Sequence, residues 1–407
     1  MHPLSRRPVT IVVLLLATAL SGAAQNSTWS QWRGPNRDGK STETGLLKDW
    51  PAEGPARIWR ATGVGIGYSS FSVADGKLFT LGARGSIEFV IALDEATGAK
   101  LWETANGSLF SNDRGDGPRG TPTVDGDRLY AFGGSGDLSC LAIDTGTVIW
   151  KRNVLKDFKG ANPYWGLSES PLVLEDRVLV NAGGPNASIV AFNKTTGDVI
   201  WKSESDPAGY SSGVLARVGA VTQAVFMTER RALGVDVRDG TLLWSYDGAN
   251  NRTANIATPV VSGNRVFVSS AYGTGGALLE LSPTGAKEVY STRDMMNHHA
   301  SSVLVGDHLY GFSNSILTAM GFDDGKVAWQ NRSVGKGSAI YAEGRLYLYS
   351  ENGVVGLAEA NPAGYVEHGR FRISTGQLPT WSHPIITNGK LIIRDQGTVY
   401  AYDVKAK

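Results

Sequence analysis

The sequence predicts an all-β fold, an eight-bladed β-propeller of four-stranded antiparallel blades. Two strand–turn–strand motifs alternate along the chain, and together they repeat every 40 to 50 residues or so, a period typical of propellers and solenoids. Glycine is abundant, at 51 of 407 residues, which suits many tight turns. The chain after its N-terminal apolar run shows no convincing helical periodicity. Four short strands repeated at this length are typical of propeller blades.

The first motif is an aliphatic–Asp–turn–Trp unit. Its clear copies lie at 91–102 (IALDEATGAKLW), 140–150, 189–201 and 233–244, with weaker copies at 278–290 and 317–330. We expect structural roles for its recurring residues. Asp94 accepts hydrogen bonds from turn amides, Gly98 supplies a positive φ, and Trp102 fills the gap between adjacent blades. A catalytic residue would not need to recur in every blade.

The second motif supplies the first two strands of each blade, and the Trp motif supplies the last two. Clear copies of the second motif lie at 120–133 (GTPTVDGDRLYAFG), 169–183, 257–270 and 337–350. Eight copies begin near residues 69, 120, 169, 211, 257, 300, 337 and 382. The last copy ends before its Trp strand, whereas residues 56–61 (ARIWRA) form a Trp strand with no preceding partner. We therefore predict that this N-terminal strand completes the last blade and closes the ring, which removes free sheet edges.

The N-terminus indicates export. Arg6 and Arg7 precede an apolar run at 11–20, and Gly22 and Ala24 fit a cleavage site. We predict a signal peptide at 1–24, an N-terminal extension at 25–55 and the propeller at 56–407, in the periplasm or outside the cell. Sec and twin-arginine export both remain open. Ala23 stands where a lipidated Cys would be, so no lipid anchor is expected, and no later stretch suits a membrane helix.

The composition of the chain limits the classes of partner that it could bind. A net charge of +1 argues against nucleic acid, and we expect a monomer. The single cysteine, Cys140, forms no intrachain disulfide and is expected to be a small buried core residue. The segment SNDRGDGP at 111–118 clusters Asn112, Asp113 and Asp116; a calcium site and a solvated loop are both open, and the loop is the simpler interpretation.

The spacing of Ala92, Asp94, Thr97, Gly98 and Trp102 resembles the tryptophan-docking motif of PQQ-dependent dehydrogenase propellers. The chain thus resembles the PQQ-like (pyrroloquinoline-quinone repeat) propellers, a group that includes those dehydrogenases and BamB. Its opening WSQWRGPNRDG (29–39) and its closing segment 381–404 resemble exported members of this group. The methanol-type dehydrogenases carry adjacent cysteines beside their cofactor, and this chain has one. Their catalytic Asp and calcium ligands match no residue here, so no catalytic residue and no metal ligand is assigned.

Aligning the blades on the second motif reveals two sets of equivalent residues. Because the first strand of each blade lines the central channel, each set forms a ring at one height. The mouth ring comprises Tyr68, Arg119, Ser168, Tyr210, Ile256, His299, Lys336 and Trp381. The hydroxyl ring, two residues further along each strand, comprises Ser70, Thr121, Ser170, Ser212, Thr258, Ser301, Ser338 and His383. The uniform hydroxyl ring indicates a structural role, whereas the mixed mouth ring is what a non-symmetric ligand would require.

The predicted ligand-binding residues are Tyr68, Arg119, Trp165, Glu169, Tyr210, Asn255, His298, His299, Lys336, Trp381 and His383. Long crossovers after Trp102, Trp150 and Trp244 should raise a rim around this face, making a polar and aromatic pocket. The alternative is a water-filled channel lined by whichever polar residues avoid clashes. We do not expect His298 and His299 to share a metal ion, because adjacent strand residues point to opposite faces.

Three functions follow. The leading hypothesis is an exported, non-catalytic propeller that binds a small molecule, polysaccharide or protein at the channel mouth. The second is a quinoprotein oxidoreductase, with PQQ stacked on Trp381 or Trp165, held by Arg119 and Lys336, and accompanied by Ca²⁺. The third is a BamB-like envelope scaffold that uses strand edges or outer loops.

Overall fold

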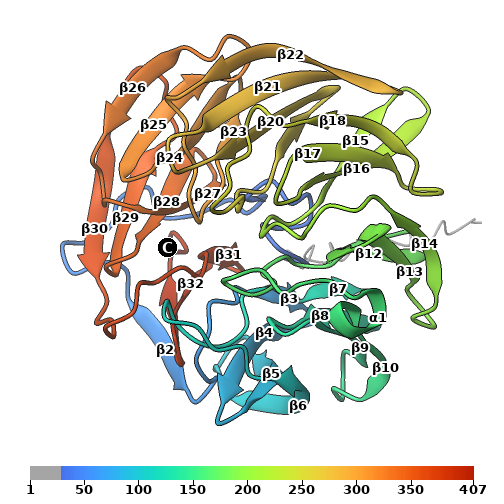
Figure 1. The fold of residues 1–407 in the computed structure, drawn as a ribbon. Helices are drawn as coiled ribbons and strands as arrows, with labels where there is room; N and C mark the ends of the chain where they lie inside the picture. Colours follow the sequence, from blue (N-terminus) through green and yellow to red (C-terminus); the bar gives the residue numbers. More distant parts are fainter. Residues whose placement is uncertain (1–28) are drawn as a thin grey trace, which may run out of the picture.

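Eight sheets of antiparallel strands surround a central axis in a computed structural model that describes residues 29–407 (Figure 1). The predicted signal peptide at 1–24 lies outside the described residues. The eight-bladed propeller is therefore confirmed, as is the division of each blade into four strands.

Within blades one to seven, the strands follow one another from the axis outward. The first four blades are β3 (Ser72–Ala74), β4 (Lys77–Arg84), β5 (Ile87–Asp94) and β6 (Lys100–Ser108); β7 (Thr123–Asp125), β8 (Arg128–Phe132), β9 (Asp137–Ala142) and β10 (Val148–Asn153); β11 (Leu172–Leu174), β12 (Arg177–Gly184), β13 (Ala187–Asn193) and β14 (Val199–Ser203); and β15 (Val214–Val218), β16 (Val221–Met227), β17 (Ala232–Asp236) and β18 (Leu242–Tyr246). The next three are β19 (Val260–Ser262), β20 (Arg265–Ser270), β21 (Gly275–Ser282) and β22 (Gly285–Thr292); β23 (Val303–Val305), β24 (His308–Ser313), β25 (Ile316–Gly321) and β26 (Val327–Asn331); and β27 (Gly337–Ala342), β28 (Arg345–Ser350), β29 (Val354–Glu359) and β30 (Glu367–Arg372).

The eighth blade joins the two ends of the chain. Strands β31 (Ile385–Thr387), β32 (Lys390–Asp395) and β33 (Thr398–Asp403) come from the C-terminus, and β2 (Arg57–Thr62) is the outermost strand. β2 pairs antiparallel with β33, with Trp59 opposite Ala401 and Thr62 opposite Thr398. This pairing agrees with the predicted closure by an N-terminal strand.

The Trp motif holds neighbouring blades together. The indole N–H of Trp59, on the closing strand, donates to Glu95 O of blade one at 3.2 Å. Trp102 repeats this with Ile143 O of blade two at 3.1 Å. Each indole also lies against a motif glycine of the next blade: a Cβ on Gly98, whose φ is 73°, would come within 2.7 Å of the Trp59 ring. Tryptophan and glycine therefore recur for one structural reason, the seam between blades.

The hydroxyl ring forms a second set of seams, close to the axis. Backbone amides in this ring donate to the hydroxyl of the next blade: Ser70 N to Thr121 Oγ1 at 3.2 Å, Thr121 N to Ser170 Oγ at 2.9 Å, Ser170 N to Ser212 Oγ at 2.9 Å, and Thr258 N to Ser301 Oγ at 2.8 Å. These bonds explain why small hydroxyl residues recur here: each satisfies an amide of the preceding blade.

The channel is filled by the N-terminal residues 29–41, here called the plug segment. Val73 N donates to Trp29 O at 2.8 Å and Val124 N to Ser30 O at 2.7 Å, so the plug segment reaches blades one and two. At its end β1 (Lys40–Ser41) pairs in parallel with β27 of blade seven. Figure 1 shows this blue segment crossing the centre of the ring. The N-terminal segment therefore crosses the channel, a feature that the repeat analysis did not predict.

Two buried arginines anchor the plug segment. Arg33 donates to Ser301 O at 3.3 Å and Ser302 O at 2.6 Å, in blade six. Arg37 donates to Gly213 O at 2.7 Å, Ser170 O at 3.1 Å and Pro171 O, in blades four and three. Carbonyl groups at the channel ends of the blades thus find their donors in one short segment.

One short helix departs from the prediction of strands alone. α1 (Val154–Phe158) has five residues and begins after Asn153, whose side chain accepts from Lys156 N. A single turn is too short to leave a periodic pattern in the sequence, and the asparagine cap stabilises it. None of the helices within residues 29–407 has the length and apolar character to span a bilayer.

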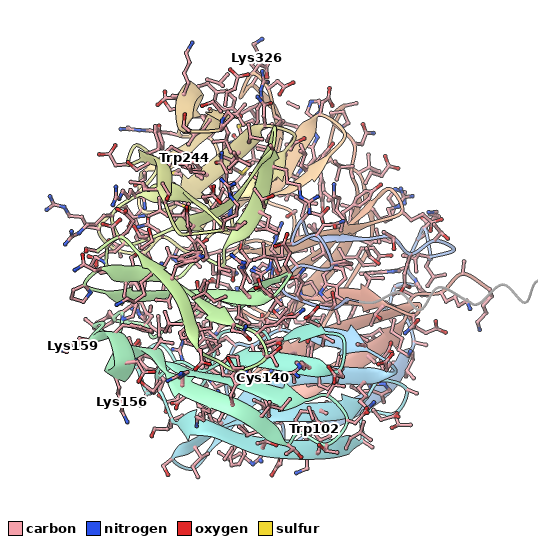
Figure 2. All side chains as sticks on the ribbon, turned by 90° about the vertical axis from the view of Figure 1, so that its right-hand side faces the viewer. Trp102, Cys140, Lys156, Lys159, Trp244 and Lys326 are labelled. Carbon is pink, nitrogen blue, oxygen red and sulfur yellow. The ribbon has the colours of Figure 1, made fainter. Side chains whose placement is uncertain are left out.

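Cys140 is fully buried, as predicted. It lies on β9 opposite Tyr130 of β8, and burial raises the pKa of its thiol. Figure 2 shows Cys140 among the packed sheets, with Lys156, Lys159 and Lys326 at the periphery.

Candidate functional site

A cavity of about 460 Å³ opens at the mouth of the channel. All eight mouth-ring residues line it, although they come from eight different blades. The plug segment closes its floor through Trp32, whose indole donates to Thr258 Oγ1 at 2.9 Å. The long crossovers contribute the rim residues Arg114, Trp165 and Thr253. The cavity is therefore blind, and its size is within the range of small-molecule sites.

The structure brings eight of the eleven predicted residues to the cavity wall: Tyr68, Arg119, Trp165, Tyr210, His298, His299, Lys336 and Trp381. Glu169, Asn255 and His383 are not among the lining residues. Glu169 is 2% exposed, and its Oε1 accepts from Asn181 N at 2.6 Å. His383 lies beneath the floor, with its ring centroid 4.5 Å from that of Trp32. Of the three residues chosen because they lie next to a ring position in sequence, His298 lines the cavity and Glu169 and Asn255 do not.

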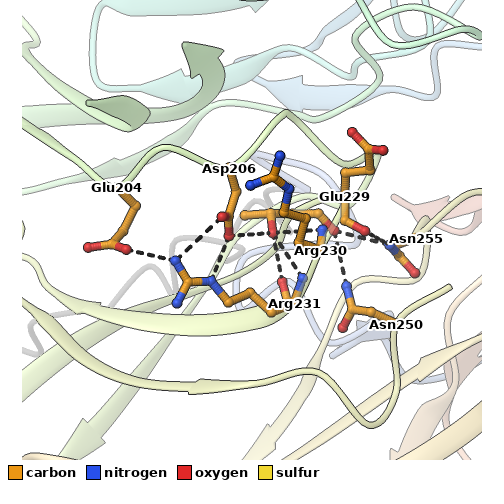
Figure 3. A network of polar contacts seen from close by, with 8 residues as sticks. Glu204, Asp206, Glu229, Arg230, Arg231, Asn250 and Asn255 are labelled. Carbon is orange, nitrogen blue, oxygen red and sulfur yellow. Dashed lines mark hydrogen bonds and ion pairs between the residues drawn. The ribbon is translucent and has the colours of Figure 1, made fainter. Parts of the chain in front are cut away.

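Asn255 supports the crossover between blades four and five. Its side-chain amide donates to Thr228 O at 3.1 Å and Glu229 O at 2.9 Å. Figure 3 shows it in a polar network in which Arg231 also binds Asp206 at 2.7 Å and Glu204 at 2.7 Å. Because its amide donates to backbone carbonyls, Asn255 stabilises the rim and does not face the cavity.

Arg119 combines a wall position with a supporting role. Its guanidinium donates to Gly115 O at 2.6 Å and to Gly117 O, which holds the 111–118 loop against the mouth. The same group lies 4.7 Å from the ring centre of Phe110 and 5.5 Å from that of Tyr68. Stacking on aromatic rings is a normal environment for a guanidinium, and it leaves a positive charge at the cavity wall.

The 111–118 loop uses its own acidic groups. Asp116 Oδ1 accepts from Ser111 Oγ at 2.7 Å and Asn112 N at 2.9 Å, and Asn112 Oδ1 accepts from Arg114 N at 3.0 Å. These bonds form the loop's turns. Of the two alternatives for this segment, the geometry favours an internally bonded loop over a calcium site.

On the opposite wall, Glu351 is the centre of a polar cluster. Its Oε1 lies 3.0 Å from Lys336 Nζ and accepts from Trp381 Nε1 at 2.6 Å. His299 Nδ1 is 3.6 Å from the same oxygen. Trp381 also packs against Tyr68, with ring centroids 5.0 Å apart. One carboxylate thus binds Lys336 and Trp381 and lies beside His299.

The geometric argument against a shared site for His298 and His299 is wrong. Residues 298–300 form a bend, not a strand, so the alternation of side chains does not apply to them. Both imidazoles line the cavity, with ring centroids 5.8 Å apart. One nitrogen from each histidine and one oxygen of Glu351 all lie within 4.8 Å of one another.

Burial controls the charge of the two imidazoles. It lowers the pKa of His298 to about 4, with the nearby Lys336 ammonium adding to the effect. Burial, together with His298 and Lys336, holds the pKa of His299 well below its ordinary value. Both rings are neutral at pH 7, so the cationic groups of the cavity are Arg114, Arg119 and Lys336.

Sequence reasoning missed Trp32, Tyr272 and Glu351. Trp32 belongs to the WSQWRGPNRDG segment, which contains two tryptophans and two arginines within eleven residues, and that density was an available signal. Tyr272 lies on the turn between β20 and β21, and its hydroxyl lies 2.9 Å from His298 Nε2. Glu351 directly follows β28, a position that the alignment of inner strands did not examine.

The fold, the docked tryptophans and the lined mouth define a PQQ-like propeller. A family model described as outer membrane protein assembly factor BamB matches residues 84–331, more than half of the chain. The chain belongs to this family.

Curated relatives carry the same description. BamB of Shewanella oneidensis is 27% identical over 224 residues, covering 52% of this chain and 51% of that protein. BamB of Burkholderia pseudomallei is 29% identical over 285 residues, covering 60% of this chain and 73% of that protein. The chain thus spans about half the length of the first of these relatives.

Solved structures of two kinds share the fold. BamB from Moraxella catarrhalis superposes with a TM-score of 0.65 at 13% identity, covering 86% of this chain and 99% of that one. A quinohemoprotein alcohol dehydrogenase from Comamonas testosteroni gives 0.62 at 13% identity, with 95% and 82% covered. A europium-containing methanol dehydrogenase gives 0.66 at 11% identity, with 91% and 90% covered. At these identities the likeness is one of fold.

Proposed function

We propose that this protein is a non-catalytic propeller of the cell envelope that binds a small molecule in the blind cavity at its channel mouth. The observation that carries the proposal is the pairing of the plug segment with the mouth ring. Trp32 of the plug lies beneath the eight mouth-ring residues, and together they line one asymmetric pocket that opens at the mouth. The mixed residue types of the mouth ring are what a non-symmetric ligand would require.

The cavity wall favours a planar ligand with negative charge. Trp32, Tyr68, Trp165, Tyr210 and Trp381 supply aromatic surface, which packs well against flat rings. Arg114, Arg119 and Lys336 supply positive charge at the rim and wall. The volume suits one small molecule or the end of a saccharide chain rather than a folded protein domain.

The envelope location rests on family membership. The relatives are named for outer membrane protein assembly, which is work done at the envelope. A periplasmic position agrees with the export signal expected at residues 1–24. The family match also supports the second function, a BamB-like scaffold for an envelope protein, which would use the outer loops or strand edges.

A quinone cofactor is the third possibility, and the residues present are compatible with it. Trp165 or Trp381 would stack on the ring system, while Arg119 and Lys336 would hold its carboxylates. PQQ would supply the ability to accept electrons from an alcohol. Arg119 is already bonded to two carbonyls and Lys336 to Glu351, so both would have to shift partners. Reconstitution with PQQ and Ca²⁺, followed by dye-linked alcohol oxidation, tests this alternative.

The main test begins with a thermal-shift screen of quinones, sugars and small organic anions. For any ligand found, we expect Arg119→Ala and Lys336→Ala each to weaken binding by about tenfold, since one charge-assisted contact contributes roughly 1.5 kcal/mol or more. Trp381→Ala should weaken it further, because the indole contributes contact area as well as orientation. Arg217→Ala, on the exposed face of β15, is the matched control and should bind normally.

A ligand whose affinity ignores all three mouth-ring substitutions would contradict the proposal and move the binding surface to the outer loops. A screen without any hit, combined with capture of an envelope protein that survives the mouth-ring substitutions, would favour the scaffold function.

A further inference from the structure

We propose that His298, His299 and Glu351 form a binding site for a divalent transition-metal ion of the zinc class in the cavity wall. This inference goes beyond the proposed function, because the ion needs no organic ligand in order to bind. Two imidazoles and one carboxylate are a donor set typical of zinc sites with an open position, and of other transition-metal centres.

The strongest observation is that the imidazole nitrogens lack partners. Both ring nitrogens of His299 are buried without a hydrogen bond from any described residue, and its side chain is only 8% exposed. His298 Nδ1 is likewise buried and unpartnered. Buried polar atoms are nearly always satisfied in folded proteins. A metal ion bound to one nitrogen of each imidazole, beside the carboxylate, would satisfy two of these three atoms.

His298 has the orientation of a metal ligand with a supporting partner. Its Nε2 is 2.9 Å from the Tyr272 hydroxyl, and its Nδ1 is left free. Histidines that bind metals usually use their second nitrogen for such a hydrogen bond, which fixes the ring and the tautomer. Tyr272 thus serves as the orienting group, and Nδ1 is the donor atom presented to the ion.

The backbone holds the three residues in place. Asn297, directly before the histidines, is buried; its Oδ1 accepts from Ser269 Oγ at 2.6 Å, and its amide donates to Phe312 O at 3.2 Å. Glu351 N donates to Lys336 O at 2.8 Å, and Glu351 O accepts from Thr380 N at 3.0 Å. The donor atoms lie within 4.8 Å of one another. Ligand atoms around a tetrahedral ion are about 3.4 Å apart when the metal–ligand bonds are roughly 2.1 Å long. Side-chain rotations that move the donor atoms by about an ångström therefore complete the site.

Lys336 is the competitor for the carboxylate. Its ammonium lies 3.0 Å from Glu351 Oε1 and would be repelled by a divalent ion. The lysine side chain lines the cavity and is 28% exposed, so it can turn into the open space. The remaining coordination positions of the ion would face the cavity, where a water or a ligand donor atom can occupy them.

The test uses purified full-length protein, stripped with a chelator and titrated with Zn²⁺ by calorimetry. We expect one ion per chain with micromolar or tighter affinity. Co²⁺ in place of Zn²⁺ should give the visible absorption of a four- or five-coordinate site. His298→Ala and Glu351→Gln should each weaken binding by about tenfold or more. Lys336→Met should strengthen it, because the competing ammonium is gone.

The matched control is His308→Asn. His308 begins β24, away from the cavity, and its Nδ1 is paired with Asp307. A site formed by His298, His299 and Glu351 leaves the control unchanged, whereas adventitious binding to surface histidines weakens the control as much as the cavity variants. Melting curves without metal show which variants fold. If a variant of a more buried ligand does not fold, His298→Ala still tests the site. Absence of stoichiometric Zn²⁺, with organic-ligand binding retained, would overturn this inference and leave the proposed function standing.

Discussion

At the scale of single residues, Glu169 was predicted to bind a ligand, and the structure places it outside the cavity wall with an unusual environment. It lies beside the mouth ring in sequence, yet its carboxyl is buried among the inner strands, where Oε2 has no hydrogen-bond partner among the described residues. Burial raises its pKa to about 8, while the Asn181 amide and the charge of Arg37 oppose the shift. The folded protein therefore holds this carboxyl in its protonated form at neutral pH.

The raised pKa of Glu169 predicts that the free energy of unfolding depends on pH. Between about pH 4.5 and 8 the unfolded chain releases this proton while the folded chain retains it, so stability falls as the pH rises through this window. Each pKa unit corresponds to about 1.4 kcal/mol, so the loss can reach a few kcal/mol. Glu169→Gln carries no proton to lose. We expect its melting temperature, relative to wild type, to be higher at pH 8 than at pH 5.

Thermal unfolding of both proteins across pH 5 to 8 is the measurement. The difference between them cancels the contribution of every other titrating group. A difference that stays constant with pH would show that Glu169 ionises normally in the fold.

The mouth ring was predictable because a propeller converts a repeat alignment into a spatial ring. Once Tyr68, Arg119, Lys336 and Trp381 were aligned, the axis had to bring them together. The pairing of His298 with His299 was not predictable, because it depends on a bend that breaks strand alternation. Such local backbone geometry has no periodic signature in the sequence.

At the scale of elements, the plug segment is the part that repeat analysis could not place. It occurs once, so it has no aligned copies, and its contacts are to residues far away in sequence, many of them more than a hundred positions away. Arg37, for example, reaches Ser170 and Gly213. The strands of the blades were predictable because each pairs with its immediate neighbour in sequence.

Arg37 provides the test of this element. Its guanidinium is buried, and it donates to carbonyls of blades three and four and to Gln31 Oε1 at 2.8 Å. Arg37→Met fills similar space but leaves those carbonyls without donors. We expect a loss of about 3 kcal/mol in the free energy of unfolding, since each buried unsatisfied group costs about 1–3 kcal/mol.

Arg217→Met, on the exposed face of β15, is the matched control and should change stability by less than about 0.5 kcal/mol. Chemical denaturation measures both variants. Equal, small effects would mean that the plug segment does not depend on its arginine anchors.

At the scale of the whole molecule, the ring is closed twice. β2 closes it at the circumference by pairing with β33, and Trp59 carries the seam onward to blade one. The plug segment closes it at the axis, where Trp29 and Ser30 reach blades one and two and β1 reaches blade seven. The outer closure was predictable from the Trp strand at 56–61, which has no preceding partner in sequence. The axial closure became visible only in the structure.

The two closures predict different consequences of deletion. Removing residues 29–41 takes away the plug but leaves β2 in place, so we expect a lower melting temperature with the same elution volume per chain as the wild type. Removing residues 29–61 also exposes the backbone edge of β33 and empties the groove that Trp59 fills against Gly98. An unpaired strand edge invites association with other chains, so the larger deletion should melt at a much lower temperature and form oligomers. Thermal melts with size-exclusion chromatography at several concentrations separate the two. If the larger deletion melted like wild type and kept the oligomeric state of wild type, β2 would not be what holds the last blade to the first.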